Sequence, residues 1–429
     1  MSGPSSSPHP LTPSPIRERG DWTATQRRTL RLLFATQIVS GMGVAIGSSV
    51  GALLAAELAG IGLSGLAQSA VIIGGALAAI PATAIVHRHG RRPSLAAAYG
   101  VAAVGALVVV LAAVRGSLPL LFLGYFLFGG ATAANYQARY AAADLAPSEL
   151  RGRHLSLIIW ATTIGAVAGP HLAAPAGTAL FRFGIPTLAA PYFFSALLFV
   201  VTGLAVFTLL RPDPALLAGT AGREGGGHAR LRDGWRAVVA RAPAVLGVTA
   251  MAVGQMVMSG TMAMTPVHIR GAGHDATQTL RIVGMVISVH IAGMYAFAPL
   301  VGWLTDRLGR RPVIFAGVVL LLAACALAGS AGYDSSRLAA GLFLVGLGWS
   351  CTMVAGSTLL TESVPLELRA AAQGFSDLIM GLAGATAGAL SGVVVSAWGF
   401  PVLALVAAIA TVPLIVLGAT IRTERALGA

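Results

Sequence analysis

Apolar runs of about 20 residues recur along the whole of this 429-residue chain. A helix needs about 20 apolar residues to cross the hydrocarbon core of a bilayer. Apolar side chains make up 56% of the residues and charged ones only 10%, which is too few to cover a soluble surface of this size. The sequence therefore predicts an all-α membrane protein, and it excludes a large soluble catalytic domain.

The apolar runs fall into two sets of six, separated by a polar stretch. The runs predict twelve transmembrane helices near residues 29–55, 64–86, 93–114, 118–142, 154–177, 186–210, 243–266, 281–304, 312–331, 337–361, 370–396 and 401–421. We expect one bundle over 29–210, a linker over 211–241 and a second bundle over 242–421. Residues 1–28 are rich in Pro and Ser and lack the apolar core of a signal peptide, so we expect a disordered tail there and a second tail over 422–429.

The arginines predict the orientation. The chain contains 28 basic residues, and all of them are arginine. Basic residues in short loops stay on the cytoplasmic side of a membrane, and 23 of the 28 arginines lie on one side when the termini share it. We therefore expect both termini and the linker in the cytoplasm of a bacterial cell, in its inner membrane. The formal charge of +13 then needs no nucleic-acid partner.

The second part of the linker has helical spacing. Leu231, Trp235, Val238 and Val239 are three or four residues apart, which predicts an amphipathic helix on the inner leaflet. Such a helix would join the two halves.

Two loop sequences repeat. The second span ends in HRHGRRP (His87 to Pro93) and the eighth in DRLGRRP (Asp306 to Pro312), 219 residues later. PSELR after the fourth span likewise returns as PLELR after the tenth, 218 residues later. Duplicated six-helix halves are typical of transporters, with the substrate path between the halves.

The segment Gly302 to Arg311, GWLTDRLGRR, is similar to the loop motif of major facilitator superfamily transporters. The resemblance extends over about residues 29–421 and implies two pseudo-symmetric six-helix bundles. It also implies a gating role for these residues of the two loops: Gly90, Arg91, Arg92, Asp306, Arg307, Gly309, Arg310 and Arg311. The alternative is that the arginines only fix the topology.

The first-half loop departs from the family pattern. His87 stands where the acid belongs and Thr83 where the first glycine belongs, so the first-half latch is in doubt, and His87 is instead a candidate for a pH-sensitive latch. Family acids near the inner ends of helices four and ten pair with loop arginines. Here these acids are Asp144 and Glu362, and their partners are Arg91 or Arg92 and Arg310 or Arg311. Solvated carboxylates are the alternative.

Ionisable side chains within the spans are costly and mark candidate functional sites. Asp377 lies ~12 Å along its helix from Arg369 and shares a face with Gln373 and Gly384. We predict that Asp377 is the principal coupling or substrate-orienting carboxylate, because burial disfavours its charged form. A structural pair with another helix is the alternative. His290 is also near mid-depth, as a proton acceptor, a substrate ligand or a satisfied core histidine.

Other polar side chains complete the candidate site. Asn135 and Arg139 share one face of the fourth span, where Arg139 either faces a cavity or extends to the membrane surface. Gln255 lies in a methionine-rich span that suits either a pocket for varied apolar ligands or contact with lipid. Trp349 and Gln37 are further candidates.

The fifth span contains Gly165, Gly169 and Pro170, which resemble the GxxxGP core of the drug/proton antiporters of this superfamily. Small residues four apart allow close helix packing, and proline bends a helix. Generic helix packing is the alternative reading. Tyr125 stands where that group of antiporters carries an intramembrane arginine.

We expect a secondary active transporter that exports small organic molecules in exchange for protons. An importer or facilitator of a metabolite is the alternative within transport, and a non-transporting membrane sensor is the alternative from another class. The sequence contains no phosphate-binding GxxxxGK[ST] loop and no motif of a membrane-embedded enzyme. We expect no cofactor and no metal, a small-molecule substrate, protons and lipid as partners, and a monomer.

A cysteine placed at Gly225 tests the topology. A membrane-impermeant thiol reagent should not label it on intact cells, because the linker is predicted to be cytoplasmic. Permeabilised cells provide the positive control. Labelling of this cysteine on intact cells would overturn the orientation.

Overall fold

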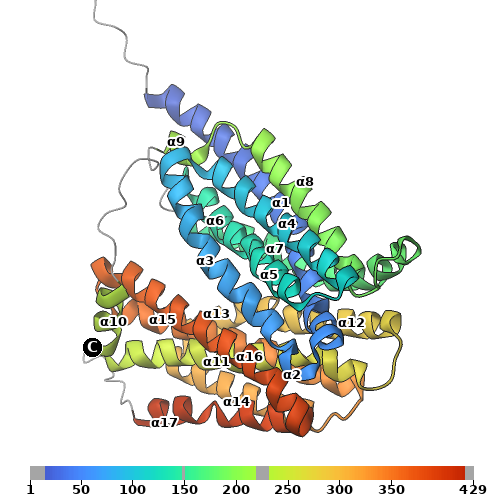
Figure 1. The fold of residues 1–429 in the computed structure, drawn as a ribbon. Helices are drawn as coiled ribbons and strands as arrows, with labels where there is room; N and C mark the ends of the chain where they lie inside the picture. Colours follow the sequence, from blue (N-terminus) through green and yellow to red (C-terminus); the bar gives the residue numbers. More distant parts are fainter. Residues whose placement is uncertain (1–14, 147–149, 219–230, 421–429) are drawn as a thin grey trace, which may run out of the picture.

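The computed structural model describes residues 15–146, 150–218 and 231–420, and all the regular elements in these ranges are helices (Figure 1). The first half contains α1 (Pro15–Ala59), α2 (Ile61–Ser64), α3 (Leu66–His89), α4 (Arg91–Arg115), α5 (Leu118–Phe128), α6 (Gly130–Ala143), α7 (Arg151–Ala179), η2 (Phe181–Phe183) and α8 (Ala190–Leu209). The linker contains α9 (Pro214–Leu217) and α10 (Leu231–Val239). The second half contains α11 (Ala242–Arg270), α12 (Ala276–Tyr295), α13 (Ala298–Leu308), α14 (Arg310–Gly329), α15 (Ser335–Ser363), η3 (Leu366–Leu368), α16 (Arg369–Ile409) and α17 (Val412–Thr420).

The helices agree with the expected all-α membrane fold. In the described ranges, eleven helical stretches are long and apolar enough to span a bilayer. The last of them, Ala371–Thr420, has 50 residues, about twice what one crossing needs. Its backbone turns at Gly399 (φ 82°, ψ 173°), so this stretch accounts for the two final spans that the sequence predicts.

The first helix begins before the first predicted span. α1 begins at Pro15, inside the stretch 1–28 that we expected to be a disordered tail. Proline suits a first helical turn, and the helix is held by its next turns, where Gln26 Nε2 donates to the Ala142 carbonyl (2.7 Å) and Leu30 is buried. Residues 1–14 and the expected tail over 422–429 lie outside the described part of the chain.

The core of the first half is a column of aromatic rings. Tyr99, Phe199, Phe128 and Tyr192 follow one another with ring centroids 5.4–6.4 Å apart. The glycines of α1 make room for this column, since a Cβ added at Gly47 would lie 2.6 Å from the Phe128 ring. Close packing of this kind holds helices together in lipid, where the hydrophobic effect between them is absent.

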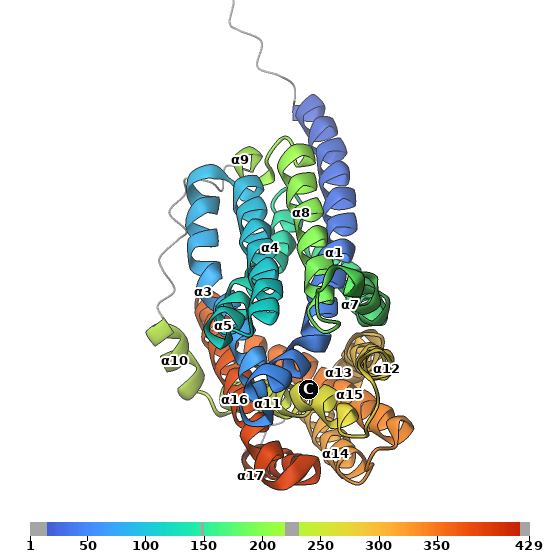
Figure 2. The same ribbon diagram turned by 45° about the vertical axis from the view of Figure 1, so that its right-hand side comes forward.

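The two halves contact each other mainly at one end. We call the end that carries α9, α10 and the turns at Gly90 and Gly309 the linker side. In Figure 1 the halves meet near α2 and α12 and diverge toward the linker side, and Figure 2 shows the same separation from another direction. The contacts described next all lie away from the linker side.

Glycine backbones form the contact between α3 and α16. A Cβ added at Gly65 would lie 2.0 Å from the Gly388 carbonyl oxygen. One turn further along, Ser69 Oγ donates to the Ala385 carbonyl (2.6 Å). A second contact joins α7 to α12, where Ser288 Oγ donates to the Val167 carbonyl (2.7 Å). Side chains larger than these would hold the halves apart.

A substitution of Gly388 by leucine tests this contact. The added side chain has no room against the Gly65 backbone, so we expect the halves to separate at this end, at an overpacking cost of about 1–3 kcal/mol. Spin labels at Ile61 and Trp398, both exposed at this end, should report a longer distance by pulsed electron paramagnetic resonance.

Gly381→Leu is the matched control on the same helix, because a Cβ added at Gly381 would meet nothing within 4 Å. We expect the label distance in this variant to stay at the wild-type value. An unchanged distance in a folded Gly388→Leu variant would contradict the role of the glycine contact.

Candidate functional site

The turn of the first half carries a partly buried ion pair. Gly90 has φ 92° and ψ −178°, which only glycine adopts readily. Arg91 follows it and donates twice to Asp144, from Nε to Oδ2 (2.9 Å) and from Nη2 to Oδ1 (3.2 Å). Its third donor group, Nη1, reaches Gln137 Oε1. The expected pairing is present, and the arginine that makes it is Arg91.

The second half repeats the arrangement. Gly309 has φ 94° and ψ 162°. Arg310 donates from Nε to Glu362 Oε2 (2.8 Å) and from Nη2 to Oε1 (2.5 Å). Arg310 Nη2 is also 3.6 Å from Asp306 Oδ1. This network is more open to solvent, with Asp306 78% and Glu362 50% exposed against 10% for Asp144.

The other arginines of the turns lie over aromatic rings. Cation–π contacts join Arg92 to Phe207 (4.7 Å), Arg307 to Trp303 (5.1 Å) and Arg311 to Phe315 (5.7 Å). His87 is exposed and forms no hydrogen bond or ion pair with a described residue. Arg92, Arg307 and Arg311 therefore add cation–π contacts beside the two ion pairs.

A buried polar network crosses the first half. Gln37 Nε2 donates to Tyr99 Oη (2.8 Å), and Tyr99 Oη donates to Asn135 Oδ1 (3.0 Å). Ser40 Oγ donates to the same amide oxygen (2.6 Å). Gln37 is fully buried and Asn135 is 7% exposed. Both residues were expected to bind substrate or couple transport, but the structure places them inside the first half, where they fix α1, α4 and α6 to one another.

A second polar cluster lies in the other half, close to α16. Trp349 Nε1 donates to Gln255 Oε1 (2.9 Å), and Gln255 Nε2 donates to Ser259 Oγ (3.1 Å). The Tyr295 ring meets the Trp349 ring edge-on, with centroids 5.8 Å apart. A Cβ added at Gly384 would lie 3.2 Å from the Gln255 side chain, so α16 packs directly beside this cluster.

Arg139 and Asp377 bring opposite charges from the two halves together. Arg139 belongs to α6 and Asp377 to α16, and the two lie near each other without forming a direct ion pair. The Arg139 guanidinium lies 5.0 Å from the centre of the Tyr136 ring, and Arg139 Nε is buried without a hydrogen-bond partner among the described residues. Asp377 and Gln373 are exposed on one face of α16. The structure thus brings Arg139, Asp377 and Gln373 to the surface between the halves.

His290 lies elsewhere. Its side chain is fully buried between α12 and α15, where Nδ1 donates to the Leu342 carbonyl (2.7 Å). Nε2 is buried without a partner in the described part of the chain. The contact to Leu342 lies within the second half, so the geometry is that of a core histidine, one of the three roles that the sequence leaves open.

The glycine motif of α7 packs against both halves. A Cβ added at Gly165 would lie 2.1 Å from the Ile38 carbonyl of α1. On the other side of α7, a Cβ added at Gly284 of α12 would lie 2.7 Å from the Pro170 carbonyl. Gly169 likewise faces α1, near Ala45. The motif therefore joins α7 to its own half and, at Pro170, to the other half.

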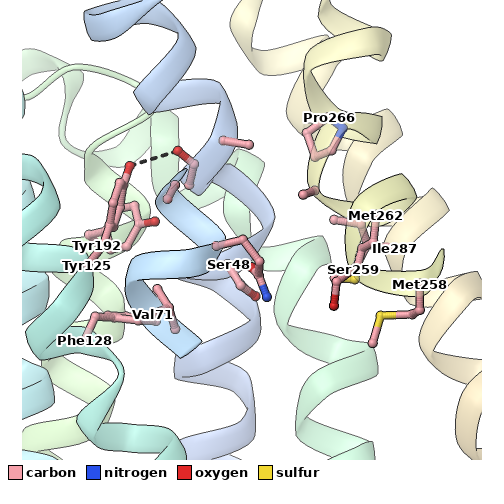
Figure 3. A pocket seen from close by; sticks show the side chains of 15 residues that line it. Ser48, Val71, Tyr125, Phe128, Tyr192, Met258, Ser259, Met262, Pro266 and Ile287 are labelled. Atoms are coloured by element: carbon pink, nitrogen blue, oxygen red, sulfur yellow. Dashed lines mark hydrogen bonds between the residues drawn. The ribbon is translucent and has the colours of Figure 1, made fainter. Parts of the chain in front are cut away.

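A small pocket of about 30 Å³ lies between the halves and is large enough for about one water molecule (Figure 3). Tyr125, Tyr192 and Ser48 face it from the first half, and Met258 and Ser259 from the second (Figure 3). Part of the methionine-rich stretch thus faces the interface between the halves rather than lipid. Since Ser259 accepts a hydrogen bond from Gln255, this pocket adjoins the Trp349 cluster.

Tyr99 and Asp213 are among the residues of these networks that the sequence analysis did not predict. Tyr99 lies in a predicted apolar span, and its hydroxyl group is the sequence feature that could have indicated a buried hydrogen bond there. Asp213 accepts hydrogen bonds from the backbone N–H groups of Arg91 (3.1 Å) and Arg92 (2.7 Å) and so joins the linker to the first-half turn. The signal for Asp213 was the sequence Asp213-Pro214, since Asp before Pro is typical of a helix start.

Comparisons with known proteins agree with this architecture. The sequence model of the Major Facilitator Superfamily matches residues 32–282 and 273–427. The uncharacterised MFS-type transporter YdeG of Bacillus subtilis (strain 168) is 37% identical over 396 residues, 91% of this chain and 90% of the relative. The riboflavin transporter RfnT of Brucella anthropi is 28% identical, over 84% of this chain and 87% of the relative.

A solved structure supports the fold. The crystal structure of a bacterial homologue of the human lysosomal transporter Spinster, inward-facing and unoccupied, has a TM-score of 0.71 at 15% identity. The similarity covers 92% of this chain and 96% of that one. With its helical spans, its duplicated turns and these relatives, the chain belongs to the major facilitator superfamily and transports small molecules across a membrane.

Proposed function

We propose that this chain exports small, partly apolar organic molecules across a bacterial inner membrane in exchange for protons. The substrate binds between α6 and α16, which carry Arg139 and Asp377. The observation that supports the proposal is a pair of opposite charges on different halves: Arg139 of α6, whose Nε is buried without a partner among the described residues, and the exposed Asp377 of α16. Alternating access exposes the surface between two halves to each side of the membrane in turn.

We place the linker side and both termini in the cytoplasm. The support for this orientation is that 23 of the 28 arginines belong to the segments that the sequence predicts on the side of the linker and the termini. The halves then contact each other at their outer ends, so the conformation described here faces inward. A molecule leaving the cell binds first in this conformation.

Exchange requires that substrate and proton compete for one group. Among the acids in the described spanning stretches, Asp377 lies furthest from the end of its stretch, six residues after Ala371. A cationic or hydrogen-bond-donating group of the substrate binds the charged carboxylate, and a proton displaces it. The exposed ring of Tyr136 and the half-buried rings of Tyr295 and Trp349 offer apolar surface to the rest of the substrate.

Import together with protons is the second candidate. Arg139 Nε is buried without a partner among the described residues, so it is a free donor for an acceptor group on a substrate. An acceptor bound to Arg139 would weaken its attraction for charged Asp377, and proton and substrate would then bind together. The riboflavin transporter of Brucella anthropi is a relative whose substrate carries such ring carbonyls.

Asp377→Asn tests the coupling. In proteoliposomes with an imposed pH gradient, wild-type protein should accumulate ethidium, an aromatic cation, against its gradient. The variant should lose this accumulation and keep some downhill exchange, because the binding surface survives and the titrating group does not. Glu367→Gln, which removes an exposed acid from η3, is the matched control and should transport like wild type.

The sign of proton movement separates the two candidates. Ethidium added to detergent-solubilised protein should release protons if export by exchange is correct. Proton uptake on adding riboflavin would favour import instead. A well-folded Asp377→Asn variant with undiminished pH-driven transport contradicts both, whereas a low melting temperature alone would indicate a structural role for Asp377.

The two turns should differ in sensitivity. Asp306→Asn removes one carboxylate near Arg310. We expect the transport rate to change roughly two- to fivefold, which corresponds to the free energy of a partly exposed ion pair. His87→Ala should change the rate less, because His87 has no bonded partner among the described residues. Ethidium transport measures both. If both substitutions changed the transport rate equally and negligibly, the two turns would have a role in topology only.

A further inference from the structure

We propose that Asp213 fastens the linker permanently to the turn of the first half, so that only the second-half turn changes its partners during transport. The proposal rests on alternating access of the two halves. It does not depend on the direction of transport or on proton coupling.

The Asp213 carboxylate holds two helix starts at once. It is 9% exposed, and its Oδ1 accepts from the N–H groups of Arg91 (3.1 Å) and Ala215 (2.9 Å). Its Oδ2 accepts from the N–H of Arg92 (2.7 Å). Free N–H groups at a helix start favour a negative charge, so the carboxylate stabilises both α4 and α9. Gly90 leaves the space, since a Cβ there would lie 2.5 Å from Asp213 Oδ2.

This contact extends the ion pair of the first half into the linker. Asp213 fixes the backbone at Arg91, and the Arg91 side chain grips Asp144 and Gln137 of the α6 end. Linker, α4 and α6 are thereby joined through charge-assisted bonds with little access to water. The side chains of Arg91 and Asp144 are only 13% and 10% exposed.

The second-half turn differs at its glycine, because no carboxylate lies beside Gly309 among the described residues. A Cβ added at Gly309 would have only Pro312 within 4 Å, at 3.8 Å, where Gly90 has a carboxylate. The side chains of Arg310, Glu362 and Asp306 are 27%, 50% and 78% exposed. An exposed network exchanges partners at lower cost than a buried one. Switching is therefore assigned to this turn.

The far end of the linker is docked on the other half. The Trp235 ring of α10 meets the Phe375 ring of α16 edge-on at 5.5 Å, and a Cβ added at Gly234 would lie 2.2 Å from the Ala371 carbonyl. The linker thus contacts both halves. The Asp213 contact makes the α9 end of the linker move together with the first half.

A pair of spin labels at Arg88 and Leu216, both exposed, measures the clamp. The background lacks Cys325 and Cys351, the two cysteines of the chain. Wild type should give one narrow distance by pulsed electron paramagnetic resonance. Asp213→Ala should broaden it, and Asp213→Asn, which keeps one oxygen acceptor, should broaden it less. Asp233→Ala, another acid of the linker, is the control and should leave the distance narrow.

A cysteine at Gln373, exposed between the halves, measures opening of the linker side by its labelling rate. Glu362→Gln should change this rate roughly two- to fivefold, the equivalent of a partly exposed ion pair, while the distance between positions 88 and 216 stays narrow. Asp213→Ala should broaden the distance and leave the labelling rate within twofold.

Two results would overturn the proposal. One is a narrow distance between positions 88 and 216 in a folded Asp213→Ala or Asp213→Asn variant. The other is a labelling rate that responds to the Asp213 variants and not to Glu362→Gln. Neither measurement uses a substrate, so their outcome is independent of the proton-exchange experiments on Asp377.

Discussion

Lipid removes the hydrophobic drive between helices, so this fold depends on how closely helix backbones approach one another. Glycine makes such close approaches possible: Gly165 lies against the Ile38 carbonyl in the first half, and Gly65 lies against the Gly388 carbonyl between the halves. Many dispersion contacts form along such seams, each of them weak. The position of glycine along each helix therefore determines where helices cross.

The same constraint separates rigid contacts from separable ones. Inside the first half, helices are joined by buried bonds such as Tyr99 to Asn135 and by the ion pair of Arg91 with Asp144. Between the halves, the contacts described above are glycine seams with single serine hydroxyls, those of Ser69 and Ser288. Breaking a buried ion pair leaves uncompensated charges. Separating two helices that touch at glycines exposes backbone groups that are still hydrogen-bonded within their own helix. Each half can therefore move as a unit against the other.

Sequence reasoning succeeded where the signal is local. Hydropathy predicts the spans. An arginine in a short loop and an acid at a nearby helix end predict an ion pair, such as that of Arg310 with Glu362. It did not place Gln37 and His290, because their environment depends on how a helix is rotated about its axis. In a soluble protein a polar face fixes that rotation, but in a membrane both the lipid face and the core face are apolar. The direction of Asp377 was easier to predict, because a charged side chain within a span avoids lipid and faces the interior of the bundle or a cavity.

The absence of an acid at position 87 fits the difference between the two turns. In the second half, Arg310 lies between two carboxylates, 2.5 Å from Glu362 and 3.6 Å from Asp306. An arginine with two competing carboxylates can pass from one to the other without being left unpaired. The Arg91 side chain has one carboxylate partner, Asp144, and its remaining bond goes to the neutral amide of Gln137. Breaking that pair would leave a nearly buried charge uncompensated, so the first-half turn is built to hold its partner and the second-half turn to exchange it.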